Sequence, residues 1–289
     1  MLTRRGFVRR LVALAIMATF PFPFRATGQS PLTQGQAPRS AGRKSIGSYF
    51  ADEELEYEVS FWFLKRVATA KMTFARLPKA GRFVATLQGE TVGLVGWLTR
   101  YRVDSYRAVM EEVEGGSRLR SISFDEYVKI GSKVRRNIHR FDHEKRRWTH
   151  ESSRRDGTMR KVDYPIPEGA SYDDFLTASY NFRYGVYGPM ERGKKFVVPT
   201  FPRKGVRSYE ITVASKEEEE YRRRKEGVDQ DAAYFITLIL DPEVVNSREG
   251  VIEGWLSRDL YPVRGTIKEA ILFGDVKGKL VAKTPAEKT

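Results

Sequence analysis

The chain has 289 residues, with 51 lysines and arginines against 37 acidic residues and a formal net charge of +14. Cysteine is absent, which excludes disulfides, thiolate catalysis and Cys-ligated zinc or iron–sulfur sites. The positive charge favours anionic partners such as lipid headgroups or acidic polysaccharides, although charges of both signs spread over a soluble surface would give the same composition.

Residues 1–28 have the organisation of a cleaved signal peptide. A basic start is followed by the apolar run Leu11–Phe20 and by small residues up to Gly28, and the run is too short to span a bilayer. The pair Arg4-Arg5 resembles the twin-arginine export motif, and an arginine-rich Sec signal is the alternative. We therefore expect a periplasmic protein, exported by the Sec or the twin-arginine route, cleaved near Gly28 and without a later transmembrane segment.

Composition then divides the rest of the chain. Residues 29–50 are rich in Gly, Pro, Ser, Gln and Ala, which predicts a disordered linker. Residues 51–278 are expected to form a single β-rich domain, and the lysine-rich residues 279–289 a flexible tail.

Alternating apolar and polar residues open the domain. The stretch 55–74 predicts two strands that meet at a tight turn around Leu64–Arg66, and residues 82–89 resume the alternation after a Pro-Lys-Ala-Gly turn. A bend at Gly93 and Gly96 leads into the next segment.

The segment Trp97–Glu111 has the strongest strand composition in the chain, with aromatic and β-branched residues and no Pro or Gly. In a strand, Tyr101, Val103 and Val109 would share one face, and Arg102, Asp104 and Tyr106 the other. Asp104 is then either the partner of Arg102 in a buried ion pair or a polar group that faces a ligand.

The chain continues as a meander. Glu114-Gly115-Gly116 predicts a hairpin turn, two strands fall within residues 133–153, and another follows over 159–162. A helix is expected over Tyr172–Tyr184, capped by Ser171, with Asp173 and Asp174 in its first turn.

The charged run 216–227 predicts a surface feature, either a helix supported by acid–base pairs or a solvated loop or hairpin. Further strands are expected over residues 195–200, 208–214, 233–240, 251–257 and 263–273. The fold class is therefore mainly β, a large curved antiparallel sheet or half-open barrel with one packed helix.

No motif identifies an enzyme. His139 and His143 would lie about 13 Å apart in a strand, too far to share one metal ion, so surface histidines are expected and no metal site. Signatures for nucleophilic serine, zinc, phosphate loops and dinucleotides are missing from the sequence, and we assign no catalytic residue and no cofactor.

Several stretches in order resemble the bacterial domain of unknown function 3108 family of exported proteins. They are L-E-Y-E-V-S-F and K-R-V-A-T-A-K-M at 55–72, V-G-W-L-T-R-Y-R-V-D-S-Y at 95–106, R-R-N-I-H-R-F-D at 135–142, P-I-P-E-G-A-S-Y-D-D-F-L-T-A-S-Y-N-F-R at 165–183 and W-L-S-R-D-L-Y-P-V-R at 255–264. The resemblance implies a long curved antiparallel sheet and a periplasmic address, and the outline is also similar to Lol-type lipoprotein carriers.

These observations favour a non-enzymatic protein that binds an amphipathic or anionic envelope component, such as lipid, lipoprotein or polysaccharide, on the concave face of the sheet. Export argues against nucleic acid as a partner. An envelope assembly scaffold and a carboxylate-dependent glycan hydrolase are the alternatives. The aromatic and charged residues that we expect to contact the ligand are Tyr101, Arg102, Asp104, Tyr106, Tyr180 and Arg183.

Overall fold

The computed structural model describes residues 44–154, 156–203, 206–239, 247, 250–271 and 274–284. The expected signal peptide and most of the expected linker lie outside these residues. Helix α2 (Ile46–Phe50) lies within the stretch predicted to be a linker, and its Ile46 and Phe50 are buried in the main core. The linker prediction is therefore wrong for this end, because two large apolar side chains are enough to hold one helical turn on the sheet.

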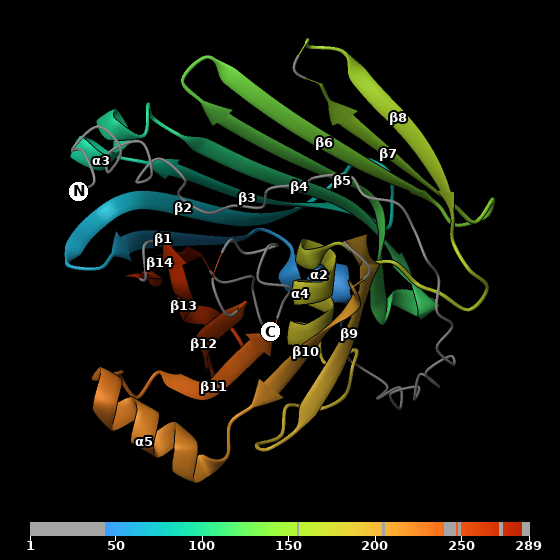
Figure 1. Ribbon diagram of the computed structural model, residues 1–289. Coiled ribbons are helices and arrows are strands. Elements are labelled where there is room, and N and C mark those ends of the chain that lie inside the picture. Colours follow the sequence, from blue (N-terminus) through green and yellow to red (C-terminus); the bar gives the residue numbers. More distant parts are fainter. Residues whose placement is uncertain are drawn as a thin grey trace.

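A single antiparallel sheet of fourteen strands confirms the mainly β fold (Figure 1). The first eight strands are β1 (Glu53–Phe61), β2 (Leu64–Arg76), β3 (Arg82–Thr91), β4 (Val103–Val113), β5 (Arg118–Ile130), β6 (Lys133–Asp142), β7 (Arg147–Ser153) and β8 (Met159–Pro165). The other six are β9 (Lys195–Arg203), β10 (Val206–Val213), β11 (Ala232–Ile239), β12 (Val251–Ser257), β13 (Pro262–Ile271) and β14 (Gly274–Thr284).

The strand order is that of a meander whose first and last strands pair. It runs β8-β7-β6-β5-β4-β3-β2-β1-β14-β13-β12-β11-β10-β9, so β8 and β9 are the two edges and the sheet stays open between them. The first and last strands meet in the middle of the sheet, where Val59 of β1 lies opposite Gly278 of β14.

Alternation along each strand separates an inner face from an outer face. In β4 the inner residues Asp104, Tyr106, Ala108 and Met110 are buried, and Arg107 on the outer face is exposed. Small and apolar inner residues give the sheet a surface on which a helix can pack.

Residues 97–102 do not belong to the strand that we expected to begin at Trp97. Helix α3 (Gly93–Leu98) includes Trp97, and Arg100 and Tyr101 follow with positive φ values of 58° and 48°. This left-handed turn cannot continue a pleated strand, so β4 begins only at Val103.

Helix α4 (Phe175–Tyr184) lies inside the curve of the sheet (Figure 1). Leu176 and Tyr180 pack into the main core with β1–β7, whereas Ala178 and Phe182 pack on residues of β9, β10 and β12. A helix that is buried all round links the two halves of the sheet. It begins later than predicted, because Asp174 and not Ser171 is the N-cap.

Two C-terminal segments are more regular than expected. Helix α5 (Lys216–Glu226) settles the charged run as a helix, with Ser215 as its N-cap and Gly227 at its end. Strand β14 reaches Thr284, so residues 279–284 of the predicted tail lie in a strand that pairs with β1. The described residues contain four α-helices, and α4 is the packed helix that we expected on the sheet.

Candidate functional site

The N-terminus of α4 is anchored inside the protein by Asp174. Its Oδ1 accepts hydrogen bonds from the backbone N–H groups of Leu176 (2.9 Å) and Thr177 (3.0 Å), and its Oδ2 accepts one from the Ser121 hydroxyl of β5 (2.8 Å). Burial raises the pKa of Asp174 to about 6, against the lowering effect of these hydrogen bonds. The cap therefore also ties the helix to the sheet.

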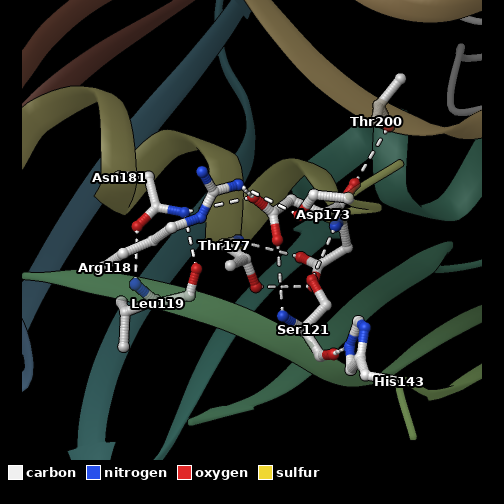
Figure 2. A network of polar contacts seen from close by, with 10 residues as sticks. Arg118, Leu119, Ser121, His143, Asp173, Thr177, Asn181 and Thr200 are labelled. Atoms are coloured by element: carbon white, nitrogen blue, oxygen red, sulfur yellow. Dashed lines mark hydrogen bonds and ion pairs between the residues drawn. The ribbon is translucent and has the colours of Figure 1, made fainter. Parts of the chain in front are cut away.

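Asp173 and Asn181 complete this anchor (Figure 2). Asp173 pairs with Arg118 of β5 at 3.0 Å, and burial raises the pKa of Asp173 although Arg118 lowers it. The Asn181 amide accepts from the Leu119 N–H (2.9 Å) and donates to the Leu119 carbonyl oxygen (2.8 Å). The side chain thus pairs with β5 as another strand would.

A second buried ion pair holds the C-terminal end of α4. The Arg183 guanidinium donates to both carboxylate oxygens of Glu53 in β1, each at 2.6 Å. It also lies over the rings of Phe50, Tyr180 and Tyr261. Burial opposes the charge of Arg183, but the Glu53 carboxylate more than offsets this and the pKa of Arg183 is raised.

The six predicted ligand-contacting residues therefore lie in separate places. Tyr180 and Arg183 are enclosed at the end of α4, and Tyr106 is buried, with its ring 5.3 Å from that of Phe175. Tyr101 is largely exposed, beyond the start of β4. Their role in ligand binding stays a prediction.

Arg102 and Asp104 form a buried pair on the inner face. Arg102 Nε lies 2.8 Å from Asp104 Oδ2, and Arg102 Nη2 lies 3.0 Å from Oδ1. Burial raises the pKa of Asp104 by more than Arg102 lowers it. On the neighbouring strands Asn137 donates to Glu126 at 3.0 Å, so this part of the inner face carries further polar groups.

A row of small residues leads across the inner face to this pair. Gly254, Gly265 and Gly278 lie opposite one another on β12, β13 and β14, and Val59 of β1 faces Gly278. The row continues through Ala68 of β2 and Thr91 of β3. The backbone N–H of Thr91 donates to the Arg102 carbonyl oxygen at 3.0 Å.

Space remains above the middle of this row. A Cβ atom added at Gly265 or Gly278 would meet no atom within 4 Å. The aliphatic side chains of Val59, Ile252 and Ile267 near the row are only half-buried. We call Val59, Gly254, Gly265, Gly278, Ile252 and Ile267 the open stretch of the inner face. Sequence reasoning missed it, because nothing local shows that glycines on three strands will be neighbours.

Two hollows elsewhere are polar. One of about 480 Å³ is lined by residues including Arg118, Arg120, His143 and Arg146. Arg118 already pairs with Asp173 and Arg120 with Glu111 at 2.6 Å, and Arg146 donates to the carbonyl oxygens of Ile166 and Pro167. The other, of about 600 Å³, lies beside it and carries charges of both signs, including Arg140 and Glu151.

His139 is not the surface residue that we expected, whereas His143 and His150 are half-buried. His139 is buried and stacked on His150 with ring centroids 4.5 Å apart, and its Nδ1 accepts a hydrogen bond from Trp148 Nε1 at 3.1 Å. Burial lowers the pKa of His139 well below its usual value, and His150 adds to the effect. Within the described ranges, no group of three or more His, Asp or Glu side chains is placed to hold a metal ion.

The described strands form one antiparallel sheet that curves around helix α4 and is not closed into a barrel. Residues 56–281 match the family described as protein of unknown function DUF3108, and the chain belongs to this family.

Two solved structures are similar in outline. A β-barrel-like protein of domain of unknown function DUF1849 from Brucella abortus has 11% identity and a TM-score of 0.42, over 81% of this chain and 97% of that one. A DUF1089 family protein from Pseudomonas aeruginosa has 10% identity and a TM-score of 0.26, over 83% of this chain and 95% of that one. No curated protein matches.

Proposed function

We propose that the protein is a non-enzymatic periplasmic protein that binds an amphipathic envelope lipid or the lipid part of a lipoprotein. The acyl chain lies on the open stretch of the inner face, and the polar headgroup lies beside Arg102 and Asp104. The observation that carries the proposal is the cross-strand row that joins an open aliphatic surface to a buried polar pair.

The chemistry of the row suits such a ligand. Glycines on adjacent strands let a chain approach the backbone, and half-buried Val59, Ile252 and Ile267 offer apolar contact area. Arg102 and Asp104 satisfy each other in the free protein, so a headgroup would add hydrogen bonds without first uncovering an isolated charge. The inner face of β1–β7 beyond the open stretch is covered by α4 and the aromatic core.

Hydrolysis of glycan has less support. Four buried acids of the described residues have close partners: Glu53 pairs with Arg183, Asp104 with Arg102 and Asp173 with Arg118, and Asp174 caps the N-terminus of α4. A general acid and base need contact with substrate or water. These carboxylates fix the fold instead.

The test is native mass spectrometry and lipid extraction of the full chain purified from the periplasm. Gly278→Leu should leave the fold intact, because the added side chain enters open space, but should fill the open stretch and remove most of the bound lipid. The control is Lys277→Leu, on the adjacent outer-facing position, which should retain the wild-type amount. Wild-type protein without lipid, or equal lipid in Gly278→Leu, would contradict the proposal.

A further inference from the structure

One end of the sheet carries large apolar side chains that the core does not use. Trp62 and Phe63 in the β1–β2 turn are each 73% exposed, Leu94 and Trp97 of α3 are 73% and 65% exposed, and Tyr101 is 60% exposed. We call these five residues the aromatic tip. Contiguous exposed side chains of this size mark an interaction surface, whereas single ones do not.

The two segments of the tip lie together. The Val92 N–H, just before α3, donates to the Val67 carbonyl oxygen of β2 at 2.9 Å, and Val95 of α3 packs on buried Phe61 and Val67. Figure 1 shows α3 and the β1–β2 turn at the same end of the sheet, away from α4. Buried Phe61 and Val67, with partly buried Val95 packed on them, thus lie beneath the exposed residues.

The backbone places the aromatic rings outward at a conformational cost. Trp62 has a φ of 56° in a turn where glycine would be unstrained, and its ring lies 5.2 Å from that of Phe63. Such strain costs about 1 kcal/mol or more in a non-glycine residue. The turn therefore presents two large rings to solvent, and one of them, Trp62, occupies a position where glycine would be unstrained.

Basic residues surround the tip. Lys65, Arg66 and Arg100 adjoin the tip residues in sequence and are exposed. The β5–β6 turn adds Lys129 and Lys133, and Gly131 of this turn donates its N–H to the Arg100 carbonyl oxygen at 3.1 Å. The acids at this end include Glu58, which pairs with Arg66 at 3.4 Å, and Glu90, so positive charge exceeds negative charge.

This combination fits one partner better than others. Trp, Phe and Leu surrounded by Lys and Arg are the side chains that enter the headgroup region of a bilayer while their basic neighbours contact anionic lipids. No helix in the described residues is long and apolar enough to cross a membrane. We propose that the aromatic tip docks the protein peripherally on an anionic lipid bilayer. The inference does not depend on ligand binding in the open stretch.

Vesicle flotation with the full chain tests it. Wild-type protein should float with vesicles that contain phosphatidylglycerol, bind phosphatidylcholine vesicles at least about tenfold more weakly, and dissociate at high salt. The variant Trp62→Ser/Phe63→Ser/Trp97→Ser should lose binding by about tenfold or more. The matched control is Val197→Ser/Tyr221→Ser, which removes exposed apolar side chains of β9 and α5 and should bind as wild type does.

A measurement on the unaltered protein protects the test against misfolding of the variant. Brominated phosphatidylglycerol should quench the fluorescence of Trp62 and Trp97, whereas buried Trp148 and Trp255 should be unaffected. No flotation with anionic vesicles, no quenching, or full binding by the triple variant would overturn the inference. A concentration-dependent dimer that the triple variant abolishes, without vesicle binding, would instead make the tip a contact between copies. Gly278→Leu should still float, so loss of lipid ligand and loss of docking can be told apart.

Discussion

Several buried charged residues of this protein form ion pairs with one another. Glu53 and Arg183 are separated by 130 positions in the chain, yet the guanidinium and carboxylate meet with two hydrogen bonds and are both inaccessible to solvent. A buried pair with this geometry costs little as a unit, but either member alone would be a desolvated charge. The pair therefore makes the position of α4 relative to β1 specific.

Breaking the pair from one side should be much worse than replacing both members. We expect Glu53→Gln and Arg183→Met each to lower the free energy of unfolding by about 3–5 kcal/mol, and Glu53→Leu/Arg183→Met to recover most of the loss. Equilibrium urea unfolding followed by circular dichroism measures this. Glu54→Gln, next along β1 on the outer face in an exposed contact with Lys71, is the control and should change little. Additive losses in the double variant would show that the two residues act independently.

At the scale of elements, helices α4 and α5 start in the same way but in different surroundings. Both N-caps accept hydrogen bonds from backbone N–H groups of the first turn, from Asp174 in α4 and from Ser215 in α5. Asp174 is buried and also bonds to Ser121 of β5, whereas Ser215 is exposed. Water can replace the Ser215 cap, but it has no access to the start of α4.

The same kind of substitution should therefore have unequal effects. Asp174→Ala leaves buried N–H groups and the Ser121 hydroxyl without their acceptor, and we expect a loss of roughly 3 kcal/mol. Ser215→Ala should cost about 1 kcal/mol or less. Urea unfolding of both variants in one buffer gives the comparison. Equal losses would mean that the Asp174 hydrogen bonds contribute no more than an exposed cap.

The local sequence patterns predicted most of the strands and helices, but few of the contacts between them. The alternation of apolar and polar residues predicted the strands before α4, but it did not predict β14. In β14 the outward residues Lys277 and Lys279 alternate with Gly278 and Leu280, so the apolar signal is weak. The break before β4 depends on two residues with positive φ, which composition does not reveal. The Arg102–Asp104 pair was one of two predicted alternatives, since its members are two positions apart.

The glycine row and the Glu53–Arg183 pair depend on which strands become neighbours. The order β1-β14-β13-β12 follows only when the first and last strands pair, and a sequence pattern of period two carries no information on that pairing. The aromatic tip could not be predicted for another reason. Trp62 and Trp97 lie in stretches whose composition is typical of core strands, and they are exposed only because Trp62 lies in a turn and Trp97 in α3.

For the whole molecule, the core crosses the boundary between the two halves of the sheet. Phe201 of β9, from the second half, packs on the inner face of the first half, with ring centroids 4.5 Å from His139 and 5.6 Å from Trp148. Tyr261, just before β13, is in the same core cluster as Leu55 of β1. The pairing of β1 with β14 adds a continuous ladder between the halves.

We therefore predict that the two halves unfold together in one cooperative transition. Trp148 in β7 and Trp255 in β12 are buried reporters of the first and second half. In variants that retain one of them and carry Phe at the other tryptophan positions, fluorescence and far-ultraviolet circular dichroism should give the same urea midpoint. The comparison is made within each variant, because the loss of either core tryptophan changes stability. If the Trp255 signal changes at lower urea than the circular dichroism of the same protein, β9–β14 unfold separately, and α4 does not couple the halves as its two packed faces imply.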